Sequence, residues 1–136
     1  MEVIVGRAVI EGEATGELLV SPEPLSFWGG YDYHSGEITD RRHALSGQIA
    51  AGRVLVLPFT RGSSTTTQVL LEAIRAGTAP AAIVSTEADS FLALASIVAQ
   101  EMYGRTLPIL MLSAEDCARL RTGTRVSVEG NLLRIL

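Results

Sequence analysis

The stretch that decides the fold covers residues 54–75 and reads VLVLPFTRGSSTTTQVLLEAIR. Its first four residues are all apolar, which is typical of a strand that is covered on both faces. From residue 64 onward the apolar side chains fall on one helix face. They are Val69, Leu70, Ala73 and Ile74. We therefore expect a buried strand, a loop over residues 58–63 and a helix over residues 64–75.

The same alternation of strand and helix continues toward the C-terminus. Residues 81–84 form another apolar run, and Thr86 to Asp89 resembles a capping box that opens a helix ending near Gly104. A third strand is expected over residues 107–112, followed by a short helix capped by Ser113. The centre of the chain therefore reads as β-α-β-α-β.

The two ends of the chain are rich in strands. Residues 3–10 suggest one strand bent near Gly6, and residues 17–20 suggest a second. The tail, residues 125–136, alternates like a hairpin around Gly130 and Asn131. The pattern predicts a mixed α/β domain with a compact sheet or barrel and helices packed outside it.

Composition excludes several classes of function. The 136 residues carry a net charge of −4 and include no lysine, so binding to nucleic acid or to an anionic membrane is not expected. The N-terminus lacks the basic and apolar regions of a signal peptide, and we expect a cytoplasmic protein. Only 19% of the residues are charged, against about 25% in typical domains, which favours a surface partly covered by a partner.

Cysteine and histidine are scarce. The one cysteine, Cys117, excludes an internal disulfide and a self-contained cysteine-ligated cluster, so it is interpreted as a small buried side chain. His34 lies in a turn, and we expect His43 to be structural or exposed. With only these two histidines and no nucleophile-elbow motif, a serine hydrolase is a distant alternative.

The main chemical signal is Arg61-Gly62-Ser63-Ser64, which follows a buried strand and opens a helix. Free backbone N–H groups and the helix dipole favour an anion at such a junction, and glycine lets the ligand approach. The guanidinium of Arg61 suits a carboxylate. The plain alternative is that one of Ser63, Ser64 and Thr65 only caps the helix.

A second unusual segment contains Phe27, Trp28, Gly29 and Gly30. So much aromatic surface beside paired glycines either plugs one end of a barrel or faces a ligand or partner. Both readings stay open on the sequence alone.

Together the two segments resemble the small subunit of the aconitase X family. Pro24-Leu25-Ser26-Phe27-Trp28-Gly29-Gly30 looks like its N-terminal signature, and Arg61-Gly62-Ser63-Ser64 with Ala79-Pro80-Ala81-Ala82-Ile83 looks like its second half. The resemblance implies one swivelling domain over residues 1–136, of the α/β class. It would have three β/β/α layers in a barrel-like arrangement, as in the small domain of aconitase.

The resemblance also implies roles for residues. In aconitases the first serine of this motif removes the substrate proton, which points to Ser63 as the catalytic base. An arginine two positions later binds substrate carboxylate in aconitase, but this chain has Thr65 there. Arg61 is then the candidate for the carboxylate contact, with Gly62, Ser64, Phe27, Trp28, Gly29 and Gly30 as further substrate-binding candidates.

Family members act as cis-3-hydroxy-L-proline dehydratases or phosphomevalonate dehydratases. The resemblance therefore implies a hydro-lyase subunit acting on a small hydroxy acid, with hydroxyproline favoured. It would pair with a large subunit, as a heterodimer or higher assembly, and that subunit would hold an iron–sulfur cluster. No cofactor or metal is expected on this chain. The alternative is a non-catalytic anion-binding or regulatory module that uses the same loop.

Overall fold

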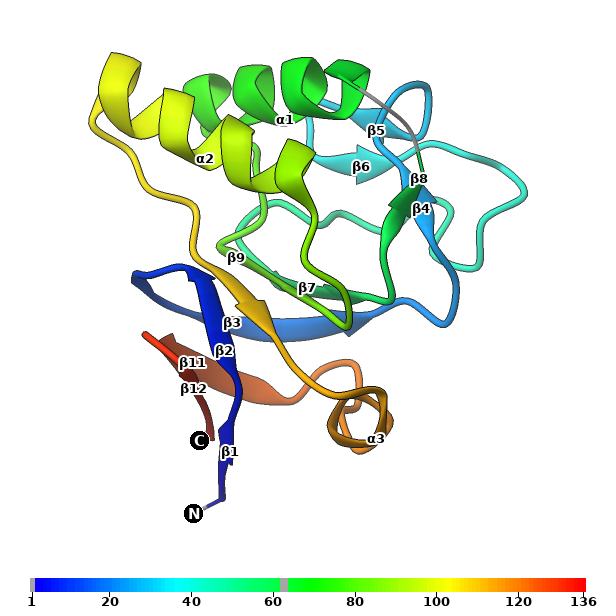
Figure 1. The fold of residues 1–136 in the computed structure, drawn as a ribbon. Helices are drawn as coiled ribbons and strands as arrows, with labels where there is room; N and C mark the ends of the chain where they lie inside the picture. The colour runs from blue at the N-terminus through cyan, green and yellow to red at the C-terminus, as the bar shows by residue number, and fades with distance from the viewer. Residues whose placement is uncertain (1, 62–63) are drawn as a thin grey trace.

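The computed structural model describes residues 2–61 and 64–136. Its twelve strands and three helices follow the order expected, with two additional pairs of two-residue strands (Figure 1). The strands are β1 Val3–Val5, β2 Arg7–Ile10, β3 Glu13–Val20, β4 Leu25–Ser26, β5 Tyr31–Asp32, β6 Glu37–Ile38, β7 Val54–Leu57, β8 Thr60–Arg61, β9 Ala82–Ser85, β10 Ile109–Met111, β11 Arg125–Glu129 and β12 Leu132–Ile135. The helices are α1 Ser64–Ala76, α2 Ser90–Tyr103 and α3 Ala114–Cys117.

The main sheet closes on itself through a bend at Gly6. Its strand order is β1-β12-β11-β3-β7-β9-β10-β2, so the two outermost strands are consecutive in the chain and are separated only by Gly6. A Cβ at this position would lie 2.5 Å from Leu112 Cδ2 and from the Met111 carbonyl oxygen, so a side chain has no room. Both the expected bend and the barrel-like arrangement are confirmed.

Four parallel strands form the centre of the sheet. β3 pairs with β7, β7 with β9 and β9 with β10, all in parallel. The crossover from β7 to β9 contains α1, and the crossover from β9 to β10 contains α2. The two helices therefore cover one side of the sheet, as Figure 1 shows, while β11 and β12 lie in the layer below. This is the β/β/α layering that the resemblance to aconitase X implies.

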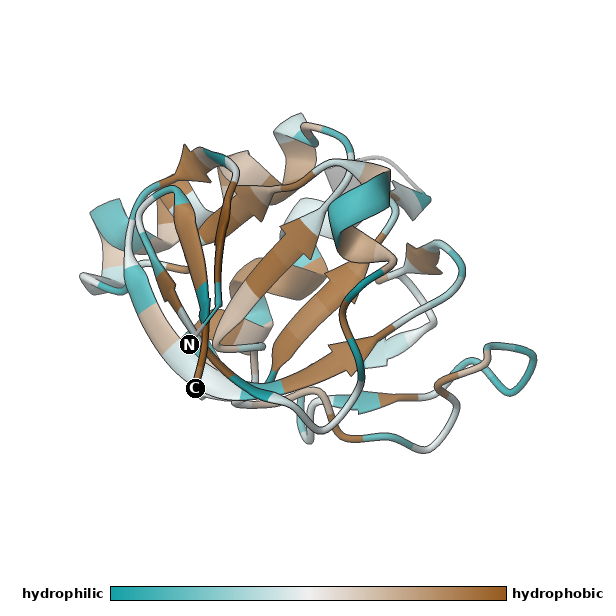
Figure 2. Ribbon diagram, turned by 90° about the horizontal axis from the view of Figure 1, so that it is seen from below, coloured by the Kyte–Doolittle hydropathy of each residue, from teal (hydrophilic) through white to brown (hydrophobic). Residues whose placement is uncertain are grey.

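Two apolar cores lie on opposite faces of the central strands. Leu55 and Leu57 of β7 belong to the core beneath the helices, whereas Val54 and Val56 belong to the core inside the closed sheet. This follows from the period of two along a strand. The helix-side core includes Leu70, Ala73, Leu92 and Ala95, and the barrel core includes Leu18, Val126, Val128 and Leu133. The central strands are accordingly mostly hydrophobic in Figure 2.

Helix ends agree with the sequence in two places and differ in one. Ser113 caps α3, and Gly104 ends α2 in the left-handed conformation with φ 67°. The cap of α2, however, is Asp89 and not Thr86. The Thr86 hydroxyl instead donates to the Pro58 carbonyl at 2.8 Å, because the chain needs residues 86–88 to pass from β9 to the helix. The expected capping box is therefore wrong.

Within the described part of the chain, none of the helices has both the length and the apolar character needed to cross a membrane.

Candidate functional site

The candidate site lies where the four parallel strands end. The carboxyl ends of β3, β7, β9 and β10 are Val20, Leu57, Ser85 and Met111. Ligands of parallel α/β sheets commonly bind at this edge, because the loops and helix N-termini that follow the strands converge there. The stretch after β7, which carries the Arg61 to Ser64 motif, is one of these loops.

A short parallel pair of strands joins the two segments singled out in the sequence. β4 pairs with β8, with Leu25 opposite Thr60 and Ser26 opposite Arg61. Figure 1 shows the two strands side by side next to the start of α1. Residues 58–63 were expected to be a loop throughout, so β8 is a correction. Two-residue strands carry no periodicity, and the sequence offered no signal for their pairing.

The aromatic segment divides between the core and the surface. The Phe27 side chain is fully buried, and its ring centroid lies 5.1 Å from that of Tyr31. Trp28, in contrast, is 68% exposed. Phe27 is therefore a core residue, although it was a candidate for substrate contact. For Trp28, Gly29 and Gly30 that contact stays a prediction.

The two glycines have conformational reasons for their positions. Gly29 has φ 74°, in the left-handed region that glycine tolerates best. A Cβ on Gly30 would overlap the carbonyl oxygen of Ser26. The Ser26 hydroxyl donates to the Trp28 carbonyl at 3.1 Å, so the turn that presents Trp28 is held from within.

Arg61 is exposed at the end of β8. Of the ion pairs formed among residues 2–61 and 64–136, none includes it. Gly62 and Ser63, the predicted glycine and base, lie outside the described residues. Ser64 is the first residue of α1, whose first turn contains no acidic residue. The positive end of the α1 dipole and the Arg61 guanidinium thus lie at neighbouring positions of the chain, which favours an anion.

Asp89 connects the start of α2 to β8. Its Oδ1 accepts hydrogen bonds from the backbone N–H of Phe91 at 2.9 Å and of Leu92 at 3.3 Å. Its Oδ2 accepts a hydrogen bond from the Thr60 hydroxyl. Thr67 adds a second link, since its hydroxyl donates to the Phe91 carbonyl at 2.9 Å. The Asp89 contact holds the strand that carries Arg61 against α2, the Thr67 contact joins α1 to α2, and sequence analysis missed both.

The threonines of α1 have separate environments. Thr67 bonds to α2, as described above, and Thr65 is partly buried. Thr66 is 1% exposed, and within the described part of the chain its hydroxyl has no hydrogen-bond partner. The run of hydroxyl residues is therefore more than a set of helix caps, because Thr66 and Thr67 lie inside the helix.

His43 is a structural residue of the loop over residues 39–48. It is 6% exposed, its Nδ1 accepts from the Leu45 N–H at 3.0 Å, and its Nε2 lies 3.1 Å from the Pro24 carbonyl oxygen. Since Nδ1 accepts, the proton is on Nε2, which donates to Pro24. His43 thereby holds the turn that leads into β4. The structural reading of His43 is confirmed.

The remaining metal-ligating side chains do not gather. The His34 backbone N–H donates to Asp32 Oδ1 at 2.8 Å in an exposed turn, as expected. Within residues 2–61 and 64–136 there is no group of three His, Cys, Asp or Glu side chains that could hold a metal ion.

Cys117 lines a cleft of about 250 Å³ at the same edge of the sheet. Apolar residues dominate its wall, among them Val20, Pro22, Leu57 and Pro58. Burial, followed by the nearby charge of Asp116, raises the pKa of the thiol above its ordinary value. The Cys117 thiol is therefore protonated, and its half-buried side chain lines the cleft. The sequence predicts a small buried hydrophobic side chain at this position, and the structure differs only in that the burial is partial.

Comparisons with known proteins bear on this site. The family model described as the aconitase X swivel domain matches residues 3–135. A cis-3-hydroxy-L-proline dehydratase of Pseudomonas aeruginosa is 54% identical over 109 residues, which cover 80% of this chain and 19% of that protein. A phosphomevalonate dehydratase small subunit of Thermococcus gammatolerans is 37% identical over 126 residues, covering 93% of this chain and 90% of that protein.

The fold has a counterpart among solved structures. The crystal structure of Thermococcus kodakaraensis aconitase X in its holo-form matches with a TM-score of 0.87 and 33% identity, covering 100% of this chain and 99% of that chain. By contrast, the chain spans about a fifth of the length of the Pseudomonas aeruginosa dehydratase and of a second hydroxyproline dehydratase, from Hypocrea jecorina.

Proposed function

The chain belongs to the aconitase X swivel-domain family, and we propose that it forms the proton-abstracting part of a dehydratase of that type. Its partner would be the large subunit, with which it forms a heterodimer or a higher assembly. The relatives named as small subunits support this arrangement, since the matches cover 84–91% of their own length. In this proposal residues 1–136 act as one swivelling domain.

The observation that carries the proposal is the pairing of Ser26 with Arg61. It brings the exposed Trp28 and the Gly29-Gly30 turn beside the strand that leads into α1. An exposed aromatic residue, an exposed arginine and the start of a helix are thus carried by adjoining segments of the chain. Such a combination suits a small ring-containing or aliphatic carboxylate, because the anion finds positive charge and the carbon skeleton finds an apolar wall.

We assign to Ser63 the removal of the proton α to the substrate carboxylate. The assignment rests on its position directly after Gly62 in the motif. A serine oxygen acts as a base only where positive charge stabilises its anion, and the start of α1 together with Arg61 would supply that charge. The electrons of the broken C–H bond form the new double bond as the hydroxyl group leaves the adjacent carbon. Protonation of the leaving group is assigned to the partner.

An iron–sulfur cluster does not fit this chain. The sequence has one cysteine, and that thiol stays protonated because burial raises its pKa. In the described residues there is also no cluster of three possible ligands. We therefore propose that any such cluster of the family is held by the large subunit, and no step assigned here to this chain uses it.

The proposed substrate is cis-3-hydroxy-L-proline. The hydroxyproline dehydratase of Pseudomonas aeruginosa is 54% identical to this chain, against 37% for the phosphomevalonate dehydratase small subunit of Thermococcus gammatolerans.

The test is a dehydration assay on this chain co-expressed with its large subunit under anaerobic conditions. Cis-3-hydroxy-L-proline and 5-phosphomevalonate are offered side by side, and each chain alone is the control. We expect turnover of hydroxyproline only when both chains are present. An assembled complex that turns over neither substrate would contradict the proposal and favour the anion-binding module.

Ser63→Ala tests the base in the same assay. Loss of a general base lowers turnover by about 10²–10⁴-fold, and assembly with the large subunit should be unchanged. Ser46→Ala, at an exposed position of the loop over residues 39–48, is the matched control. Near-normal turnover by Ser63→Ala would remove the assignment of the base.

A further inference from the structure

The outer face of α2 is unusual for a helix on the surface of a domain. Of the ten large apolar side chains that are exposed in the described part of the chain, four belong to this helix. They are Phe91, Leu94, Ile97 and Met102, with exposed fractions of 36%, 48%, 51% and 62%. The inner face is already buried, through Leu92, Ala95, Ser96 and Ala99. A helix that is apolar on all sides is normally buried on all sides.

α1 provides an internal comparison, because it covers the same side of the sheet (Figure 1). Its solvent side carries Gln68 and the ion pair between Glu72 and Arg75, whose Nη2 and Oε2 are 2.8 Å apart. Over its 14 residues α2 has a single charged residue, Glu101. Apolar exposure is therefore a property of α2 and not of the helical layer, which indicates that something covers α2 in the assembled protein.

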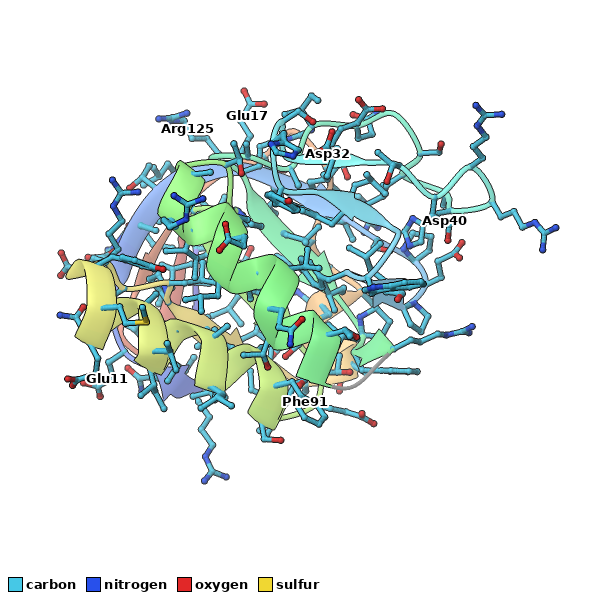
Figure 3. All side chains as sticks on the ribbon, turned by 90° about the horizontal axis from the view of Figure 1, so that it is seen from above. Glu11, Glu17, Asp32, Asp40, Phe91 and Arg125 are labelled. Atoms are coloured by element: carbon cyan, nitrogen blue, oxygen red, sulfur yellow. The ribbon has the colours of Figure 1, made fainter. Side chains whose placement is uncertain are left out.

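The face continues to the candidate site. At its N-terminal end a cleft lies between Phe91 and Phe59, and Thr60, which precedes Arg61, is part of the same wall. Figure 3 shows Phe91 beside the start of α1. At the side facing β2, a second cleft of about 260 Å³ is lined by Ile10, Ile97 and Gln100. These two clefts border the exposed apolar stripe and provide recesses for side chains of a partner.

We propose that the outer face of α2 docks onto the large subunit, an inference that rests on the proposed function. In the 54% identical relative this domain is 19% of a longer chain, so most of that protein lies outside the domain. Phe59 and Phe91 are exposed and line the cleft beside Thr60, so a partner that covers the site at Arg61 also reaches this end of the face. A second copy of this chain on the same face would compete with that partner for the rim of the site. The occupant assigned to the face is therefore the large subunit.

The test places a charge on the face. Leu94→Glu and Ile97→Glu introduce carboxylates at exposed helix positions, where they leave the fold intact but would be buried without a partner in the complex. Leu136→Glu is the matched control, because Leu136 is 57% exposed and the C-terminus lies on the side of the molecule away from α1 and α2 (Figure 1). The affinity of each purified chain for the large subunit is measured by titration calorimetry, with a thermal melt to check folding.

We expect each α2 variant to bind at least about tenfold more weakly than wild type, and Leu136→Glu to bind normally. Amide exchange over residues 90–103 should also slow when wild-type complex forms, which tests the face without any substitution. Equal binding by all variants, or unchanged exchange, would overturn the docking surface even if the complex is active. So would a dimer of the isolated chain that Leu94→Glu dissociates without affecting the large subunit. A complex that docks through α2 but dehydrates neither substrate would contradict only the proposed function.

Discussion

The Thr60 hydroxyl donates a hydrogen bond to Oδ2 of Asp89, while the other carboxylate oxygen of Asp89 caps the first turn of α2. One carboxylate thus joins two crossovers of the sheet. The strand that it anchors, β8, is only two residues long and also carries Arg61. This hydrogen bond therefore helps to hold Arg61 in position relative to the helix layer.

Thr60→Val should weaken both the fold and the site. The substitution keeps the branched shape but leaves Asp89 without its hydroxyl partner, so the free energy of unfolding should fall by about 1–2 kcal/mol. KM for the substrate should rise, because β8 no longer holds Arg61 in one place. Denaturant unfolding and steady-state kinetics measure the two effects. Thr60→Ser keeps the hydroxyl and is the control; if both variants lose activity equally, the hydrogen bond is not the cause.

Phe27 and Trp28 are neighbours in the sequence, but substitution by alanine should affect stability at Phe27 and substrate binding at Trp28. Phe27 is fully buried against Tyr31, so Phe27→Ala should lower the free energy of unfolding by about 3–5 kcal/mol. Trp28 is 68% exposed, and Trp28→Ala should change stability by less than about 0.5 kcal/mol while weakening substrate binding. Urea unfolding of the isolated chain and KM of the complex give the comparison. A large loss of stability in Trp28→Ala would place that ring in the core instead.

How much of this site could be predicted depends on the range of the contacts. The runs at 54–57 and 81–84 and the helix from residue 64 are specified by local pattern, and the structure has them as β7, β9 and α1. The β4–β8 pair joins residues about 35 positions apart through two residues each, and no local pattern encodes it. The split of the aromatic segment could not be predicted for the same reason. Only tertiary packing decides that Phe27 faces inward and Trp28 outward.

The cap of α2 shows a different limit. Thr86 and Asp89 fit the spacing of a capping box, so sequence alone placed the start of the helix three residues early. In the structure Ser85 is fully buried at the end of β9, and Thr86 bonds to Pro58 of the neighbouring crossover. The parallel sheet, and not the helix, determines where Thr86 lies. Asp89 therefore caps α2 and also accepts the hydrogen bond from Thr60.

Cys117 should be unreactive at neutral pH. Burial raises the pKa of its thiol, and the Asp116 carboxylate adds to the effect, so alkylation by iodoacetamide should be slower than for the unfolded chain at the same pH. Because the pKa of the thiol is higher in the folded state than in the unfolded state, its protonated form contributes to the free energy of unfolding at neutral pH. That contribution is lost as the pH rises through the folded pKa. Mass spectrometry of alkylation against pH measures this; equal rates for folded and unfolded chains would contradict it.

Arg61 should act on binding and leave folding unchanged. It is exposed, and within the described residues no ion pair includes it, so Arg61→Gln should shift the free energy of unfolding by less than about 0.5 kcal/mol. If it contacts the substrate carboxylate, KM should rise about tenfold or more, since a charged hydrogen bond contributes about 1.5–3 kcal/mol.

Arg61→Lys distinguishes charge from geometry, because lysine keeps the charge but loses the planar pair of donors. Intermediate KM for Arg61→Lys would indicate a bidentate contact, and wild-type KM would indicate charge alone. Arg125→Gln is the control: Arg125 is also exposed but lies away from the Phe91 end of the helices (Figure 3). If Arg61→Gln and Arg125→Gln have the same KM, Arg61 does not take the place of the arginine that is missing at Thr65.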